Sequence, residues 1–158
     1  GPEKCRYATE DLGFDVCIDY KSHKDVKSLS GALADAAPNG VQGYFENAGG
    51  YVFDSVTSQM KPFGRIALCG LISSYDGAPQ PWHNPSVILI QRLMVQGFIV
   101  TEHQDDWPHA LKELSELVVK GKLKPRESVS QGIESAPEAF LGLLKGKNFG
   151  KQLVKLVD

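Results

Sequence analysis

The sequence predicts an α/β fold in which helices cover both faces of a mostly parallel, doubly wound sheet. Segments with helical apolar spacing alternate with short apolar runs along most of the 158 residues. One such run, residues 66–69, lies between Gly64 and Gly70 and is apolar throughout, as strands covered on both faces are. The chain opens with a helical pattern instead of the strand and glycine-rich turn that begin a doubly wound domain. We therefore expect an incomplete sheet that lacks its first βαβ unit and that turn.

The first part of the chain contains two helices, each followed by a strand. Residues 3–12 predict a helix that ends before Gly13, and residues 14–18 predict an apolar strand. Apolar residues at helical spacing then predict a second helix over residues 26–36. Residues 41–46 predict the strand that follows it.

A third helix and strand come next, with a polar loop after them. The helix has an apolar face made of four residues, Val52, Phe53, Val56 and Met60. Pro62 is expected to end this helix, and residues 65–69 form the strand. Because open α/β sheets hold ligands at the carboxyl ends of their strands, we expect the loop of residues 70–75 to line a crevice.

The remaining elements continue the alternation. Residues 85–93 predict a helix and residues 94–100 a strand. Asp106 is expected to cap a helix that ends at Gly121.

The end of the chain predicts a helix and a strand. Ser135, Pro137 and Glu138 have the pattern of a capping box with proline in the first turn, and the helix is expected to end at Lys145. Residues 152–157 predict the closing strand. A basic, proline-containing segment near residues 120–126 marks either a domain boundary or a solvated turn.

Composition and charge exclude several classes of protein. The net charge is −2 and no basic run exceeds two residues, so we expect no nucleic-acid partner. The longest apolar run, residues 87–90, is far shorter than the ~20 residues of a membrane span, and we expect no membrane partner. Cys5, Cys17 and Cys69 form no Cys-x-x-Cys pair, which favours buried thiols in a reducing, cytoplasmic setting. The histidine spacing gives no zinc motif, so we expect no metal site.

One apparent catalytic motif is rejected on its order in the chain. Tyr20 and Lys24 have the Tyr-x-x-x-Lys spacing of short-chain dehydrogenases, and residues 47–49 read Asn-Ala-Gly, as in a turn of that family. In that family the asparagine turn precedes the tyrosine, whereas here it follows. Asp19 likewise has no glycine fingerprint upstream, so we interpret it as a strand-end residue.

Four segments together resemble one known family. Residues 44–50, 69–75, 96–100 and 146–151 read Tyr-Phe-Glu-Asn-Ala-Gly-Gly, Cys-Gly-Leu-Ile-Ser-Ser-Tyr, Gln-Gly-Phe-Ile-Val and Gly-Lys-Asn-Phe-Gly-Lys. In order and spacing they are similar to the zinc-independent medium-chain dehydrogenases/reductases, in the branch of alkenal double-bond reductases and prostaglandin reductases. The resemblance covers essentially the whole chain and implies an NADP-binding Rossmann-like domain.

The resemblance also implies the residues that bind NADPH. Lys4 and Tyr20 match family residues that contact the 2′-phosphate, which a cation and a phenol hydroxyl would suit. The other matching positions surround the rest of the cofactor, and they are Asn47, Cys69, Gly70, Leu71, Ile72, Ser73, Ser74, Tyr75, Phe98, Ile99, Val100 and Asn148. Each also has an ordinary structural explanation, such as a solvated cation, a strand-end aromatic, a turn former, a core strand or a helix terminator.

Tyr75 is the expected catalytic residue. In the family, NADPH delivers a hydride to the β-carbon of an enone or alkenal, and a phenol donor would stabilise the charge that develops on the carbonyl oxygen. Tyr75 could instead only shape the pocket. Quinone reduction, and a non-catalytic cofactor-binding or assembly module, remain the alternatives.

The resemblance further implies that this is the carboxyl-terminal part of a longer enzyme. We expect a partial NADP-binding domain over residues 1–121 and a segment over residues 122–158 that returns, in relatives, to an amino-terminal domain. On its own, such a chain is expected to have little reductase activity. Relatives dimerise through the strand that matches residues 94–100, so a homodimer is expected here too.

Overall fold

The computed structural model describes residues 1–75, 77 and 80–157, in two compact units. Residues 76, 78, 79 and 158 lie outside the described residues. The first unit contains residues 1–104 and the second residues 105–158. This division by packing does not test where an NADP-binding domain ends, so the boundary after residue 121 stays a prediction.

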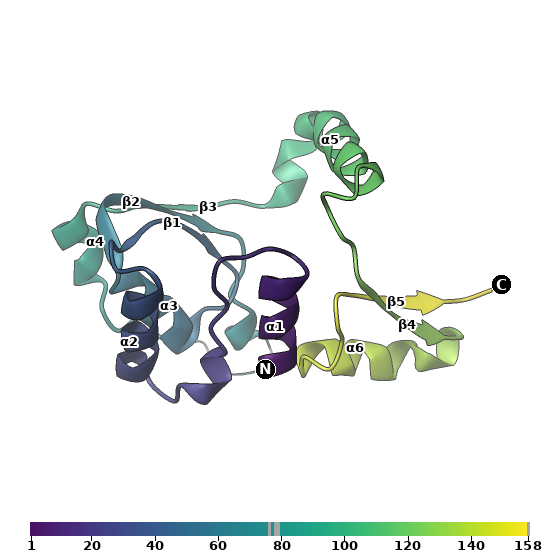
Figure 1. The fold of residues 1–158 in the computed structure, drawn as a ribbon, viewed down its shortest axis with the longest axis horizontal. Helices are drawn as coiled ribbons and strands as arrows, with labels where there is room; N and C mark the ends of the chain where they lie inside the picture. The colour runs from purple at the N-terminus through teal and green to yellow at the C-terminus, as the bar shows by residue number, and fades with distance from the viewer. Residues whose placement is uncertain (76, 78–79, 158) are drawn as a thin grey trace. The chain divides into compact units, whose positions relative to one another are not determined.

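A three-stranded parallel sheet forms the centre of the first unit (Figure 1). The strands are β1 (Val41–Glu46), β2 (Met60–Leu68) and β3 (Met94–Gly97), in the order β1-β2-β3. Both pairs are parallel, and each connection contains a helix, as parallel pairing requires. The predicted α/β class with a parallel sheet is confirmed.

Two helices, α3 (Gly50–Thr57) and α4 (Ser86–Gln91), cover one face of this sheet and form the core with it. A third helix, α2 (Val26–Ala36), packs against α3. Phe53 of α3, Ile66 of β2 and Val87 of α4 are buried in one apolar cluster. Strand register places Tyr44 beside Ile66, and the Tyr44 ring stacks on Phe53 at 6.1 Å between centroids.

The opposite face of the sheet is more open within residues 1–104. Side chains alternate between faces along a strand, so Phe45 and Met94 point away from the buried cluster. Their exposed fractions are 61% and 53%. The expectation of helices on both faces is therefore met on one face within this unit.

The predicted strand over residues 14–18 is wrong, and the preceding helix is slightly shorter than expected. Helix α1 (Pro2–Glu10) ends before Gly13, whose φ of +77° is the conformation that favours glycine. Residues 14–18 belong to neither sheet. A strand is defined by hydrogen bonds to a neighbouring strand, and this apolar run has no such neighbour among the described residues. The chain then forms a short 3₁₀ turn, η1 (Tyr20–Ser22).

Pro62 does not end α3, contrary to the sequence-based prediction. The helix ends at Thr57, and Met60 already lies in β2. The register between β1 and β2 shifts between Val41 and Gly43, so Pro62 lies in an irregular stretch of β2 where it needs no ladder hydrogen bond. Phe63, in the same stretch, has a φ of 63°.

Strand β3 is shorter than predicted because its neighbour ends. Gly97 pairs with Leu68, the last residue of β2, and the Phe98 N–H still donates to the Leu68 carbonyl at 3.2 Å. From Val100 the chain forms the 3₁₀ segment η3 (Val100–Asp106), which is kinked at His103.

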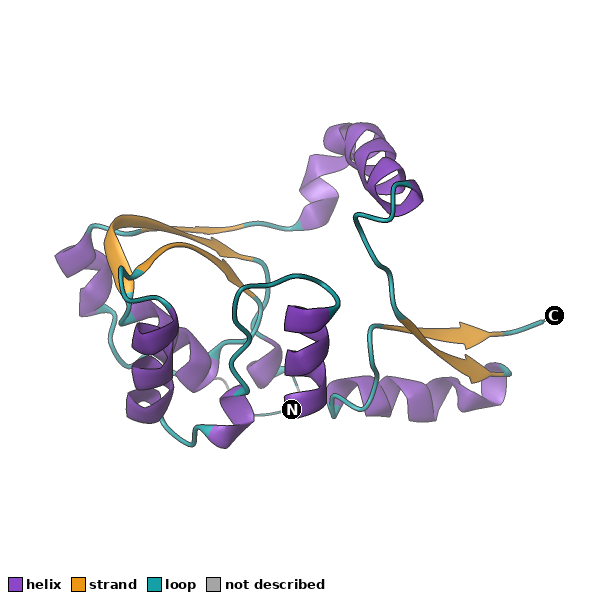
Figure 2. Ribbon diagram, in the orientation of Figure 1, coloured by secondary structure: helices purple, strands orange, loops and turns teal. Residues whose placement is uncertain are grey.

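The second unit contains two helices and a two-stranded parallel sheet (Figure 2). Its elements are α5 (Trp107–Val119), β4 (Glu127–Gln131), the turn η4 (Ile133–Ser135), α6 (Ala136–Leu144) and β5 (Lys151–Lys155). Strand β5 begins one residue before the predicted start at Gln152. Among the described residues, no helix of either unit is long and apolar enough to cross a membrane.

Both predicted caps in this unit are wrong in their detail. The Asp106 and Ser135 side chains make no capping hydrogen bond to α5 or α6. Because η4 leads directly into α6, Ser135 has helical φ and ψ angles of −79° and −12°, whereas a capping residue needs an extended backbone. Its hydroxyl donates instead to the Gly132 carbonyl at 2.8 Å.

Candidate functional site

Two loops meet at the carboxyl ends of β1 and β2. The first contains residues 47–49 and leads into α3, and the second contains residues 69–75 with the turn η2 (Ile72–Ser74). Four main-chain hydrogen bonds hold the second loop against the first loop and the end of β1. Cys69 N and Gly70 N donate to the carbonyl of Glu46, the last residue of β1, at 2.9 and 3.1 Å. Ile72 N donates to the Asn47 carbonyl at 3.0 Å, and Ser73 N to the Ala48 carbonyl at 2.9 Å. Parallel strands deliver both loops to one edge of the sheet, as the sequence predicts for residues 70–75.

Asn47 and Tyr75 converge above Gly70. A Cβ atom added to Gly70 would lie 3.0 Å from the Tyr75 hydroxyl oxygen and 3.1 Å from Asn47 Oδ1. These two polar atoms are therefore no more than about 6 Å apart, and the missing side chain of Gly70 leaves the space between them. The structure thus brings two of the predicted site residues, distant in sequence, to one point.

A cleft of about 450 Å³ opens beside this point. Its lining includes six of the predicted cofactor-binding residues: Cys69, Gly70, Leu71, Tyr75, Phe98 and Ile99. Leu68, Gly97 and Glu102 complete the lining. Glu102 is not predicted from the sequence, and its Oε2 accepts a hydrogen bond from Ile99 N at 3.2 Å, which ties η3 to the end of β3.

Four other predicted residues, Ile72, Ser73, Ser74 and Val100, are not part of the lining of that cleft. Ile72 and Ser73 are exposed in η2, and Val100 is exposed at the start of η3. Ser74 lines a second, more apolar pocket of about 170 Å³, whose walls include Phe53, Leu71, Trp82 and Val95.

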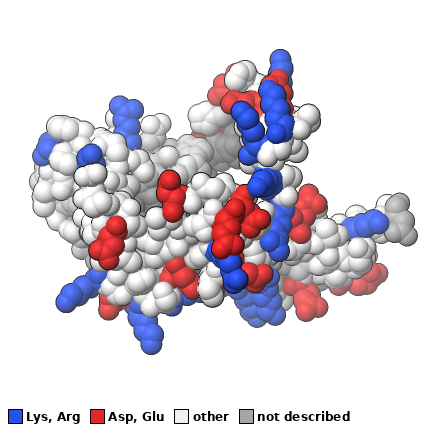
Figure 3. Space-filling view, in the orientation of Figure 1, with Lys and Arg blue, Asp and Glu red and all other residues white. Residues whose placement is uncertain are grey.

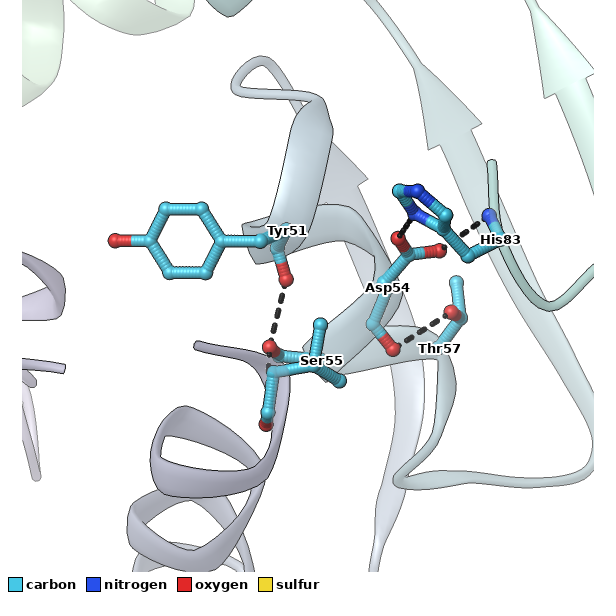
Figure 4. Close-up of polar contacts among 6 residues, drawn as sticks. Tyr51, Asp54, Ser55, Thr57 and His83 are labelled. Atoms are coloured by element: carbon cyan, nitrogen blue, oxygen red, sulfur yellow. Dashed lines mark hydrogen bonds and ion pairs between the residues drawn. The ribbon is translucent and has the colours of Figure 1, made fainter. Parts of the chain in front are cut away.

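A buried carboxylate anchors the segment that follows the second loop. Asp54 of α3 accepts the His83 N–H at Oδ1 (3.2 Å) and contacts His83 Nδ1 at Oδ2 (2.7 Å). Figure 4 shows the Asp54 carboxylate turned toward His83, on the opposite side of α3 from the Tyr51 ring. The Asp54 side chain is 3% exposed and that of His83 69%. Next to His83, the Trp82 ring packs edge-on against Phe53 at 4.9 Å.

Lys4 and Tyr20, the predicted 2′-phosphate contacts, lie in neighbouring segments. Lys4 is exposed in α1, and the adjacent Cys5 interacts with Cys17, three residues before Tyr20. Burial, followed by the Cys5 thiol, raises the pKa of Cys17 to about 11. The Tyr20 carbonyl accepts a hydrogen bond from the Tyr51 hydroxyl at 2.9 Å, and Tyr51 is the second residue of α3, which follows the first loop directly. Burial raises the pKa of Tyr51, and Tyr20 and Asp19 add to the effect.

Asn148 belongs to the second unit, whereas the other predicted cofactor-binding residues belong to the first. Its Nδ2 donates to the Gly150 carbonyl at 2.6 Å, and it lines a polar pocket with Ser128, Ser130 and Lys147. The structure describes Asn148 only within that unit.

Acidic and basic side chains both appear on the face of the molecule drawn in Figure 3. Within the described part of the chain, no group of three or more His, Cys, Asp or Glu residues could hold a metal ion.

Sequence reasoning missed Glu46, Asp54, His83 and Glu102. The signal for Glu46 was its place at the end of a strand, directly before a glycine-rich turn. Asp54 and His83 are 29 residues apart, so only the fold shows that they interact.

A parallel sheet with joined polar loops and a cleft at its carboxyl edge defines an incomplete Rossmann-like α/β domain. The family described as zinc-binding dehydrogenase matches residues 1–116. The chain belongs to this family, as a carboxyl-terminal part within its zinc-independent medium-chain branch of alkenal and prostaglandin reductases.

Individual relatives support this assignment. The chain is 42% identical over 166 residues to an NADPH-dependent curcumin reductase of Escherichia coli, covering 99% of this chain and 46% of that protein. It is 46% identical over 156 residues to prostaglandin reductase 1 of Rattus norvegicus, covering 97% and 46%. The crystal structure of CurA from Vibrio vulnificus in complex with NADPH superposes with a TM-score of 0.87 at 40% identity, covering 100% and 48%. The chain thus spans about half the length of the relatives it matches.

Proposed function

We propose that this chain is the cofactor-binding part of an NADPH-dependent oxidoreductase that reduces the carbon–carbon double bond of α,β-unsaturated ketones or aldehydes. The observation that carries the proposal is the convergence of Asn47 and Tyr75 above Gly70, at the rim of a cleft of about 450 Å³. Relatives that are more than 40% identical are named as NADPH-dependent curcumin reductase and prostaglandin reductase 1, which supports the same reading.

The residues present fit NADPH. Gly70 leaves a space that any side chain would fill, and the cleft beside it has apolar walls for a flat ring. We assign the 2′-phosphate to Lys4 and Tyr20, because a cation and a phenol hydroxyl stabilise a phosphate dianion. Asn47, residues 69–75 and residues 98–100 would hold the nicotinamide half, and Asn148 is assigned to the cofactor on the family resemblance alone.

Tyr75 is the proposed catalytic residue. When bound, NADPH supplies the hydride that adds to the β-carbon of the substrate, and negative charge then develops on the carbonyl oxygen. The Tyr75 hydroxyl donates a hydrogen bond to that oxygen and stabilises the charge where it forms. Leu71, Phe98 and Ile99 give the cleft beside Tyr75 an apolar lining.

Removing the Tyr75 hydroxyl tests the proposal in the full-length protein. Tyr75→Phe is expected to lower kcat for an enone such as a 2-alkenal about 100-fold, as loss of one such donor does, with the NADPH Kd within about twofold of wild type. An enone kcat that stays unchanged removes Tyr75 from the mechanism.

The same assay separates the alternatives. A wild-type protein that reduces quinones but no enone is a quinone reductase. A wild-type protein that reduces neither, while binding NADPH, is a cofactor-binding module.

We also propose a cytoplasmic homodimer that pairs through the β3 edge of the sheet. Three free cysteines fit a reducing compartment. Within its sheet, β3 has a strand on one side only.

A further inference from the structure

Glu46 is a buried carboxylate that the proposed mechanism does not use. It is the last residue of β1 and its exposed fraction is 0%. Oε1 accepts hydrogen bonds from Ala48 N and from Gly49 N, the latter at 2.8 Å. Oε2 is buried and has no hydrogen-bond partner among the described residues.

The two N–H groups that donate hydrogen bonds to Glu46 belong to the turn of residues 47–49, which contains Asn47. The main-chain carbonyls of this turn accept hydrogen bonds from Ile72 N and Ser73 N of the second loop. The loops are packed tightly there, because a Cβ on Gly49 would lie 2.8 Å from Ser73 Oγ. One carboxylate oxygen therefore fixes the main chain that joins both loops of the site.

Stability alone does not account for a carboxylate at this position. Burying a carboxylate without a full set of partners is unfavourable, and replacing buried charges with apolar side chains is often neutral or stabilising. Tyr44 is half-buried nearby, and burial, followed by the side-chain interaction with Glu46, raises the pKa of Tyr44. The carboxylate supplies a hydrogen-bond acceptor for the N–H groups of Ala48 and Gly49, and an apolar side chain could not do so.

We propose that Glu46 is a positioning residue of the cofactor site, which sets Asn47 against Tyr75 by holding the turn of residues 47–49 and, through it, the loop of residues 69–75. The proposal rests on the proposed function, because the positioned groups are those assigned to NADPH. Glu46 itself lies beneath the loops and touches neither cofactor nor substrate.

The experiment compares three variants of the 158-residue chain. Glu46→Leu removes both acceptors at similar volume, and Glu46→Gln keeps one amide oxygen as an acceptor. Thr57→Val is the matched control, because Thr57 is also fully buried and donates only to the Asp54 carbonyl, in the last turn of α3. Amide hydrogen exchange is measured without ligand, and NADPH affinity by calorimetry.

Glu46→Leu is expected to raise exchange about tenfold at Ala48, Gly49, Ile72 and Ser73, and to raise the NADPH Kd about tenfold, as loss of a hydrogen bond to a charged group does. Glu46→Gln is expected to restore the Kd to within about threefold of wild type, and Thr57→Val to leave it unchanged. If Glu46 only filled space, Glu46→Leu would keep the wild-type exchange and NADPH Kd, and Glu46→Gln would bring no recovery.

Two results overturn the proposal. One is unchanged exchange at these four amides in Glu46→Leu, and the other is raised exchange with an unchanged NADPH Kd. If the wild-type chain binds no NADPH, the proposed function fails, and the exchange comparison still decides whether Glu46 holds the two loops.

Discussion

At the scale of single residues, Gly70 is the position on which the site's geometry depends. The Asn47 and Tyr75 polar atoms each lie about 3 Å from the position that a Gly70 side chain would take. Such a contact is too close for a methyl group unless one of the two side chains moves. Gly70 thus allows the approach, and it lies within the lining of the cleft.

Gly70→Ala is expected to weaken NADPH binding by the 158-residue chain about tenfold, with a loss of unfolding free energy of about 1 kcal/mol or less. The added methyl displaces Asn47 or Tyr75 and fills the space assigned to cofactor. Calorimetric titration and thermal unfolding measure the two effects. Gly77→Ala is the matched control, because a Cβ there meets nothing within 4 Å. Equal affinities for both variants would show that the space above Gly70 is not used.

The sequence indicated most residues of this site and none of their contacts. The motif at residues 69–75 pointed to a crevice at a strand end, and that loop lines the cleft. That Asn47 and Tyr75 face each other depends on β1 and β2 being neighbours, which a linear pattern does not state. Glu46 and Asp54 were missed because burial and partners of a single acidic residue follow only from packing.

At the scale of elements, Trp82 and His83 are held to α3 by a buried carboxylate and an aromatic contact. Asp54 bonds both the main chain and the ring of His83, and Trp82 packs on Phe53 next to that contact. A buried acceptor with two hydrogen bonds contributes more than an exposed pair does, because its loss leaves buried groups without partners.

Asp54→Ala is expected to lower the unfolding free energy of the chain by about 2–3 kcal/mol, whereas His83→Ala should cost about 1 kcal/mol or less, because the main-chain bond to Asp54 survives. Urea unfolding of both single variants and the double variant gives the coupling between the two side chains. Purely additive losses would mean that the exposed His83 ring contributes nothing to this anchor.

Elements with a strong local pattern were predicted well, and those that depend on a neighbour were not. The strand β1, residues 65–68 of β2 and the helix α2 follow from apolar runs and helical spacing in their own residues, whereas the start of β2 at Met60 was not predicted. Residues 14–18 are equally apolar, but a strand needs a partner that this stretch does not have among the described residues. The Ser135 cap failed for a similar reason, since the preceding turn η4 decides its backbone angles.

At the scale of the whole molecule, β3 leaves one side of its sheet without a strand. Met94 of β3 is 53% exposed on the more open face of the sheet. An edge strand of this kind can pair with a second copy about a two-fold axis.

Sedimentation equilibrium is expected to show dimers at micromolar concentration, and Met94→Asp is expected to shift the equilibrium to monomer by placing two like charges near the axis. Because Met94 is already exposed, the substitution should leave the fold intact, which circular dichroism checks. A wild-type chain that stays monomeric over this range would rule out the β3 interface.

We propose that the two joined loops, the cleft and the Lys4 and Tyr20 segments form one NADPH site. Calorimetric titration of the 158-residue chain with NADPH and with NADH is the test. NADPH is expected to bind at least about tenfold more tightly than NADH, and Lys4→Ala is expected to remove most of this difference by deleting the cation assigned to the 2′-phosphate. Equal affinities for the two cofactors, or binding of neither, would contradict it.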